Sequence, residues 1–170
     1  FYLYSLYRLI GFTDNEWNVS VTSVRPKIDS VQFSFAFGEK KIATIKGTGH
    51  LMRSMMVDGE AVPSVVLPLD VGKGTTLTCE MGEVHAPYLE SVNAIVRTVR
   101  FDKHGQNLES TLSSFSGHPV VARFITTKEP KKVTLNGKRI GSQVTPQAVN
   151  SAFAITVRFT GSDRDQTLSI

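Results

Sequence analysis

The sequence predicts an all-β protein, an antiparallel β-sandwich with two similar halves at about residues 12–83 and 94–170. A shift of 78 positions aligns Asp58-Gly59 with Asn136-Gly137 and continues without a gap to Thr78 and Thr156. A match at a fixed offset indicates that one unit was built twice. Apolar and polar residues also alternate along many short segments, which is the period of a strand with one buried face. No segment after residue 12 shows sustained helical periodicity.

Residues 1–11 form a short segment that is predicted to be either helical or extended. The first ten residues are nearly all large and apolar, and Tyr2, Leu6 and Leu9 recur at helical spacing before Gly11, a suitable helix stop. Three tyrosines in the same run would also suit a strand. Because so much apolar surface needs a partner, we expect the segment to belong to, or to dock on, a preceding domain of a longer polypeptide.

The strands expected in the first half have one apolar face each and are separated by turns. An Asp58-Gly59 pair predicts a type I′ hairpin, because both central positions of that turn need positive φ. Pro68 ends the strand that returns from the hairpin. The predicted strands of this half span residues 17–22, 31–37, 42–45, 51–57, 62–67 and 75–81.

A loop at residues 83–93 is expected to separate the halves, and the second half repeats the pattern. Its Asn136-Gly137 pair predicts a second hairpin of the same type. Stacking the one-sided strands of the two halves sheet on sheet would bury both apolar faces. The predicted strands of this half span residues 94–101, 108–115, 120–125, 133–135, 153–159 and 167–170.

Charge and cysteine content argue against several classes of partner. The net charge is +4, and the basic residues are scattered apart from Lys131-Lys132 near Lys128. Such a cluster beside a strand is typical of a solvated sheet edge, so we expect no nucleic-acid partner. No apolar run approaches the length of a membrane span, so no membrane partner is expected. Lone Cys79 is expected to be a buried apolar residue, and the compartment stays open.

Enzyme motifs are incomplete in this sequence. Residues 72–75, Gly-Lys-Gly-Thr, lack the earlier glycine of a phosphate loop, and no G-x-S-x-G elbow occurs. The four histidines are dispersed, and Asp163 and Asp165 would need several more ligands to hold calcium. Asp58 and Glu60 lie on a tight hairpin, a poor frame for paired catalytic carboxylates. We therefore expect no catalytic residues, no metal and no cofactor.

Sugar binding needs only an aromatic ring and a few polar groups nearby. Trp17 is the single tryptophan, although its alternation with Val19 and Val21 also suits a core position. Tyr88 lies in the predicted loop beside His85 and is expected to be the more exposed ring. An amide such as that of Asn93 could bind hydroxyls. The candidate carbohydrate-binding residues are Trp17, Tyr88, His85 and Asn93.

Several segments resemble the C-terminal region of glycoside hydrolases and phosphorylases that have an (α/α)6-toroid catalytic domain. The resemblance is carried by LYRLIGFTDNEWNVSV, FSFAFG, IKGTGHLMRSMMVDGEAVP and KEPKKVTLNGKRI, and it spans most of the chain. In that family the last helix of the toroid runs into a β-sandwich. The family's catalytic carboxylates belong to the helical domain and have no matching positions in this sequence.

The resemblance implies a non-catalytic accessory domain that braces the catalytic domain of the same polypeptide or contacts a polysaccharide or oligosaccharide. One alternative is an autonomous carbohydrate-binding module with Trp17 or Tyr88 as its platform. Another is an adhesin-like structural sandwich that binds a protein by strand addition. An exposed aromatic pair with neighbouring amides would favour the module, and a long unguarded edge strand would favour the structural protein.

Overall fold

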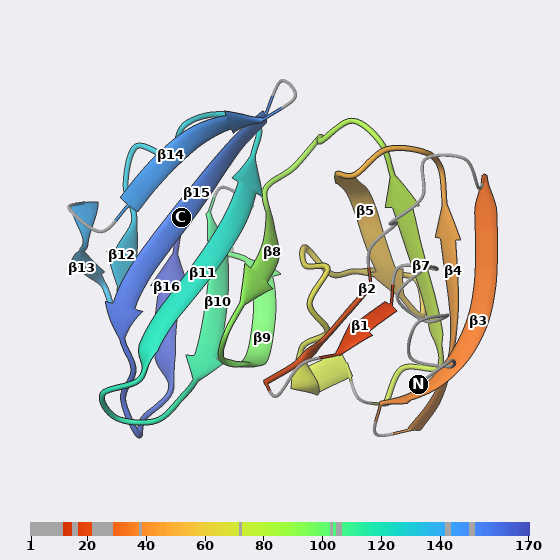
Figure 1. Ribbon diagram of the computed structural model, residues 1–170, viewed down its shortest axis with the longest axis horizontal. Helices are drawn as coiled ribbons and strands as arrows, with labels where there is room; N and C mark the ends of the chain where they lie inside the picture. Colours follow the sequence, from red (N-terminus) through yellow and green to blue (C-terminus); the bar gives the residue numbers. More distant parts are fainter. Residues whose placement is uncertain are drawn as a thin grey trace.

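Nearly all of the regular structure consists of β-strands, as the alternating pattern predicts (Figure 1). The computed structural model describes residues 12–14, 17–21, 29–37, 39–71, 73–102, 104, 107–141, 144–149 and 152–170. Residues 1–11 lie outside this range, and with them the expected helical or extended segment and its docking on a preceding domain. The all-β prediction is confirmed for the part of the chain that is described.

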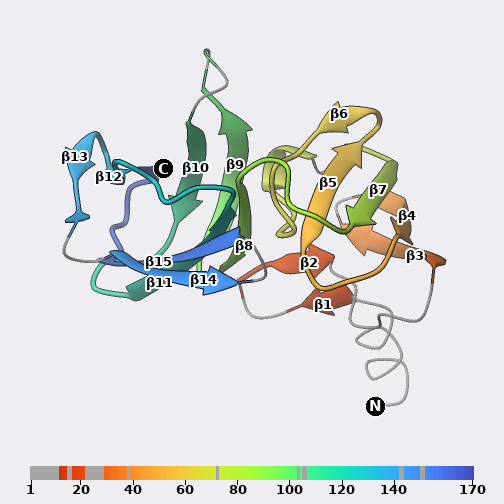
Figure 2. The same cartoon turned by 90° about the horizontal axis from the view of Figure 1, so that it is seen from above.

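The second half of the chain forms a sandwich of its own, with two sheets that face each other (Figures 1 and 2). One sheet has the strand order β13-β12-β16-β10-β9, and the other has the order β14-β15-β11-β8. The strands are β8 (Tyr88–Val92), β9 (Ile95–Phe101), β10 (Leu108–Ser113), β11 (Pro119–Thr126), β12 (Thr134–Leu135), β13 (Lys138–Arg139), β14 (Val144–Val149), β15 (Ala152–Thr160) and β16 (Gln166–Ser169).

Alternation within these strands builds the core between the two sheets. Leu108 and Leu112 of β10 and Phe124 of β11 are almost completely buried. Sheet-on-sheet stacking is therefore confirmed, but the expectation that each half supplies one face is wrong. Residues 88–170 provide both faces, because their strands are numerous enough to close a sandwich without the first half.

The first half has one large sheet with the order β3-β4-β7-β5-β6, and β1 pairs with β2 beside it (Figure 1). Its pairings are antiparallel except for β4 with β7, which run parallel. Cys79 of β7 faces β2, with its sulfur 3.9 Å from the Val21 carbonyl oxygen. The elements are β1 (Phe12–Asp14), β2 (Val19–Val21), β3 (Ser30–Phe37), β4 (Glu39–Lys46), β5 (Met52–Val57), β6 (Glu60–Ala61), the 3₁₀ helix η1 (Leu69–Val71) and β7 (Thr76–Met81).

Both predicted hairpins are present with the expected backbone. Asp58 and Asn136 have φ of 48° and 50°, and the glycines that follow have φ of 89° and 78°. After the hairpins the two copies diverge. β7 pairs with β5 next to its hairpin, whereas β15, at the corresponding position, lies in the opposite sheet from β12. The sequence repeat therefore preserves the turns but not the strand partners.

Residues 62–67 leave the first sheet and join the halves, so the prediction of a long returning strand there is wrong. Leu67 donates its N–H to the Val19 carbonyl at 2.8 Å, and Val65 donates to the Leu89 carbonyl at 3.0 Å. The segment thus lies between β2 and β8. The predicted loop at residues 83–93 is also wrong in part, because residues 88–92 are strand β8. We call residues 62–67 the junction segment.

β14 was not expected from the sequence. Its residues, VTPQAV, contain Pro146, which usually argues against a strand. Proline is tolerated here because β14 is an edge strand that pairs with β15 alone among the described strands.

Candidate functional site

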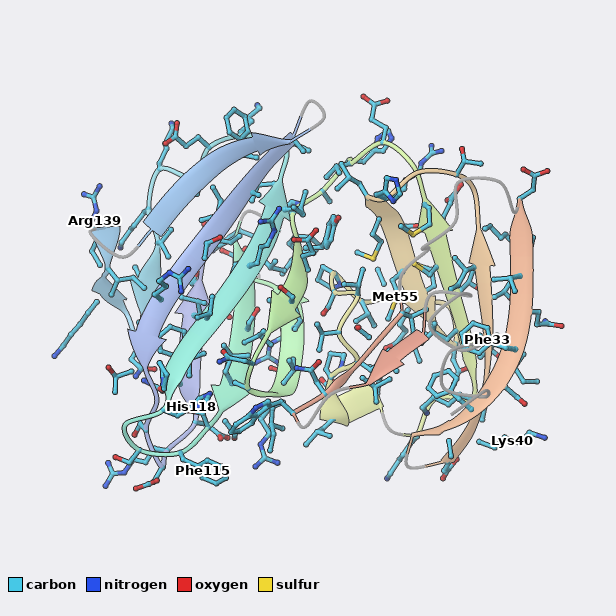
Figure 3. The ribbon with its side chains drawn as sticks, viewed as in Figure 1. Phe33, Lys40, Met55, Phe115, His118 and Arg139 are labelled. Atoms are coloured by element: carbon cyan, nitrogen blue, oxygen red, sulfur yellow. The ribbon has the colours of Figure 1, made fainter. Side chains whose placement is uncertain are left out.

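The structure separates the four residues that the sequence selected for sugar binding. Trp17 and Asn93 are brought near each other at the junction between the halves. Tyr88 and His85 are placed elsewhere. The segment between β7 and β8, which carries His85, crosses at the top of Figure 1. Phe115 and His118, whose rings lie close to that of Trp17, are at the bottom of the same view (Figure 3).

Tyr88 is not the exposed platform that the sequence suggests, since only 2% of its surface is accessible. Its hydroxyl oxygen accepts the N–H of Met52 at 3.1 Å, which ties β8 to β5. Burial raises the pKa of Tyr88 well above its ordinary value, and the Met52 hydrogen bond opposes this shift to a smaller extent. Tyr88 is therefore a structural residue of the junction and cannot stack on a sugar.

Trp17 belongs to an aromatic cluster with two residues of the β10–β11 loop. Its ring centroid lies 5.4 Å from that of Phe115, with the planes at 59°, and 4.6 Å from that of His118, with the planes at 32°. Trp17 is half-buried, whereas Phe115 is 68% exposed. The accessible ring of the cluster is therefore Phe115, and Trp17 supports it from one side.

Sequence reasoning missed Phe115 because the alternating pattern places it at the end of the strand predicted for residues 108–115. The strand ends at Ser113, and Phe115 projects from the loop that follows. The only sequence signal that could have identified it is the polar, glycine-containing run Ser114-Phe115-Ser116-Gly117, which is typical of a turn.

Backbone contacts hold the β10–β11 loop against the β15–β16 turn. Ser116 donates its N–H to the Asp163 carboxylate at 2.9 Å, and Gly117 donates to the Gly161 carbonyl at 3.1 Å. Gly161 donates in turn to the His118 carbonyl at 2.7 Å. Phe115 is thus presented by a loop whose backbone is fixed on two sides, which lowers the entropy that a ligand would have to overcome.

Gly161 is required by this arrangement. A Cβ at this position would lie 2.1 Å from Ser114 Oγ and 2.5 Å from the Phe115 carbonyl oxygen. The loop that carries the exposed ring therefore depends on close backbone approach to the turn.

Asp165 provides a second support at the start of the loop. Its carboxylate accepts a hydrogen bond from Ser113 Oγ and lies 3.8 Å from Arg97 Nε, which also donates to Ser113 at 2.9 Å. Asp163 and Asp165, considered above as calcium ligands, thus hold the loop. Among the described residues no group of three or more His, Cys, Asp and Glu side chains could bind a metal ion.

Asn93 organises the site from the other side. Its Oδ1 accepts the Val121 N–H at 2.6 Å, and its Nδ2 donates to the Pro119 carbonyl at 3.0 Å. These bonds fix the orientation of the amide, so Asn93 positions the start of β11. Asn18, the residue after Trp17, similarly ties its segment to β8, because its side-chain amide donates to the Val92 carbonyl at 2.6 Å.

His118 supplies a polar group within the cluster. Its Nε2 lies 3.1 Å from the Asn93 carbonyl oxygen, a contact that needs a hydrogen on Nε2, and 3.3 Å from Asn93 Nδ2, a contact that needs a lone pair there. The tautomer of the ring decides which of the two bonds forms, and no partner for Nδ1 lies among the residues that the structure describes. The cluster thus combines an exposed ring with a ring nitrogen that can form a hydrogen bond.

Two other sequence candidates for chemistry have structural roles. Burial raises the pKa of Cys79 to about 12, which keeps its thiol protonated, and the predicted buried apolar role is confirmed. At the end of the Gly-Lys-Gly-Thr segment, the N–H of Thr75 and the N–H of the following Thr76 both donate to the Asp58 carboxylate, at 3.1 and 2.7 Å. A phosphate could not use these donors.

In the part of the chain that the structure describes, no helix has the length and apolar character needed to cross a membrane. The function must be inferred from the geometry above, since comparison with protein-family models, with curated proteins and with solved structures finds no match for this chain.

Proposed function

We propose that this chain is a non-catalytic carbohydrate-binding β-sandwich domain, in which Phe115 is the ring on which a sugar stacks. The observation that carries the proposal is the 68% exposure of Phe115 on a loop that is fixed by hydrogen bonds. The part of an aromatic ring that stays exposed to water contributes no burial free energy to folding. That apolar area is removed from water, and stabilises a complex, when a ligand with an apolar face covers the ring.

The neighbours of Phe115 fit a sugar better than a purely apolar ligand. Trp17 lies beside it at 59°, so the two rings make an angled surface that could contact consecutive sugar units of a twisted chain. His118 Nδ1 offers a hydrogen-bonding group to a sugar hydroxyl, which can both donate and accept. This combination of exposed ring and polar neighbour supports the carbohydrate-binding module over the adhesin-like reading, and it fits the glycan contact expected of an accessory domain.

The test is a glycan array on the whole chain, followed by titration of each ligand that binds. Trp17 is the single tryptophan, so its fluorescence reports on the site directly. We expect Phe115→Ala to weaken binding about tenfold or more, as truncation of a central aromatic anchor does.

The matched control is Ile42→Ala, because Ile42 is also an exposed apolar side chain, at 47%, but lies on β4 in the other half. Ile42→Ala should bind like the original protein. A wild-type protein that binds no glycan on the array, or a Phe115→Ala variant with unchanged affinity, would exclude the proposal. Binding of a protein partner that depends on Phe115 would favour the structural alternative.

A further inference from the structure

A groove of about 450 Å³ lies between elements of both halves. Its walls come from the β5–β6 hairpin, from η1 and the loop after it, and from β9. Figure 2 shows how these elements are arranged, with β6 in the first half and β9 in the second. We propose that this groove is a second binding site, and that it takes an uncharged sugar unit.

One wall of the groove is fixed in place by two charged residues. The Asp58 carboxylate accepts hydrogen bonds from the N–H groups of Thr75 and Thr76, as described above. From the other side, Lys41 Nζ donates to the carbonyl oxygen of Val71 at 3.2 Å and to that of Gly74. The N–H groups of Thr75 and Thr76 and the carbonyl groups of Val71 and Gly74 are therefore held, so a ligand meets a preformed wall.

Packing fixes the same wall. A Cβ at Gly74 would lie 2.3 Å from Val57 Cγ1, so the loop backbone lies directly against the hairpin strand. Lys41 itself is buried, and burial lowers the pKa of its ammonium group while Glu39 and Asp58 oppose the effect. A buried lysine that is used to hold backbone carbonyls is a costly arrangement, which indicates that the position of this loop matters.

The groups that face the groove include both hydrogen-bond acceptors and donors. Glu60 and Asp70 provide carboxylate oxygens, while Lys73 and Arg100 provide N–H donors. Between them lie apolar side chains, among which Val62 and Val99 are more than nine-tenths buried and form a floor. Partial burial raises the pKa of Asp70, and Arg100 opposes that shift.

This mixture selects a class of ligand. A hydroxyl group both donates and accepts, so vicinal hydroxyls can satisfy the carboxylates and the cationic groups together, while the C–H face of a sugar covers the valines. An anion such as phosphate would meet three carboxylates, those of Asp58, Glu60 and Asp70. The N–H groups of Thr75 and Thr76 could not bind it, because they already donate to Asp58. A cation would meet Lys73 and Arg100. An uncharged polyhydroxyl ligand avoids both conflicts.

The inference extends the proposed carbohydrate binding to a second site, and one experiment separates the two. In ¹H–¹⁵N spectra of the whole chain, the indole N–H of Trp17 reports on the aromatic cluster and the amide of Gly74 reports on the groove. Neutral mono- and oligosaccharides are titrated into the original protein and into Arg100→Gln, Asp70→Asn, Phe115→Ala and Arg158→Gln. Arg158 is an exposed arginine of β15 outside the groove and serves as the matched control.

We expect saturable shifts at Gly74 that weaken about tenfold or more in Arg100→Gln and Asp70→Asn, because each loses a charge-assisted hydrogen bond to the sugar. Phe115→Ala and Arg158→Gln should leave these shifts unchanged. Trp17 shifts that persist while Gly74 never responds would overturn the groove site and leave the proposed function standing. Gly74 shifts with no response at Trp17 would support the groove site and overturn the proposed sugar binding at Phe115. A response of Gly74 to phosphate or to free amino acids, and not to neutral sugars, would overturn the inference as well.

Discussion

The Asp58 carboxylate accepts the backbone N–H groups of Thr75 and Thr76. The backbone N–H groups of Thr76 and Thr75 hold the pKa of Asp58 below its ordinary value of 3.8, with a smaller contribution from Lys41. Its carboxylate is therefore ionised at neutral pH, and folding stability depends on this charge. Because the pKa is lowered in the folded state, the stabilisation is fully present above 3.8 and is lost as the pH falls through the folded-state pKa.

We expect Asp58→Asn to lower the midpoint of thermal unfolding at neutral pH. The turn itself should survive, because Asn136 adopts the same positive φ in the second hairpin. The measurement compares unfolding of both proteins from pH 7 to pH 2, and the gap between them should narrow below about pH 3.8. A gap that stays constant across this range would show that the charge of Asp58 has no part in the stability.

Tyr88 shows how one hydroxyl can connect two halves. Tyr88→Phe should destabilise the protein by about 1–3 kcal/mol, because the N–H of Met52 would stay buried without its acceptor. Urea unfolding measures this cost. Glycan binding should not change, since Tyr88 is buried away from Phe115, and a loss of binding in this variant would contradict the placement of the site.

At the scale of elements, the important feature is the β10–β11 loop, which is hydrogen-bonded to the β15–β16 turn of the sandwich. The β10–β11 loop has no regular structure, yet Gly161 and Asp163 of the neighbouring turn fix its backbone. Loops of this kind carry function because the scaffold determines their geometry while their side chains stay accessible.

Gly161→Ala should displace this loop, because the new Cβ would clash with Ser114 Oγ and with backbone oxygen atoms that cannot rotate away. We expect a loss of stability of about 1–3 kcal/mol and weaker glycan binding at Phe115. Unfolding and fluorescence titration measure the two effects.

Gly141→Ala is the control for this substitution. A Cβ at Gly141 meets nothing within 4 Å, so its effect on stability should stay within about 1 kcal/mol. Equal effects of the two substitutions would show that close approach at Gly161 is unimportant.

At the scale of the whole molecule, the junction segment makes the two halves one structure. Leu89 donates its N–H to the Pro63 carbonyl and accepts from Val65, both at 3.0 Å, and its side chain is fully buried. Residues 62–67 also bond to β2, so the first half is attached to the sheet of the second half. The aromatic cluster and the groove both span this junction, and both depend on it.

We expect the protein to unfold in a single transition, and Leu89→Ala to cost about 2–5 kcal/mol through the cavity that it leaves at the junction. Trp17 fluorescence follows the contact between the halves, because its ring packs against Phe115 and His118, and far-ultraviolet circular dichroism follows the strands of both halves. The two signals should coincide in the wild type. Ile42→Ala should change stability by less than about 0.5 kcal/mol. Two separate transitions in the wild type would show that the halves are independent.

Local signals in the sequence predicted the local structure well. The alternation of Leu77, Cys79 and Met81 corresponds to a buried face of β7, and the Asp58-Gly59 and Asn136-Gly137 turns have the expected backbone. The prediction failed where partners decide the outcome. The sequence predicts a loop at strand β8, because this segment is short and contains polar residues. Its pairing with β11, which is distant in sequence, makes it a strand.

The candidate site shows the same division. The sequence predicts an exposed Tyr88 and a strand that ends at Phe115, whereas Tyr88 is buried and Phe115 projects from a loop. Exposure is set by what packs around a residue, and neither Met52 next to Tyr88 nor Gly161 beneath Phe115 is near in sequence.

The sequence by itself determined that this protein is made of one-sided strands with two type I′ hairpins, because strand period and positive φ are properties of neighbouring residues. Only the tertiary structure decided that residues 88–170 close their own sandwich, that the junction segment joins the halves, and that Phe115 stands exposed beside Trp17. These features depend on pairing between distant segments, and pairing is settled by burial and hydrogen-bond satisfaction over the whole chain.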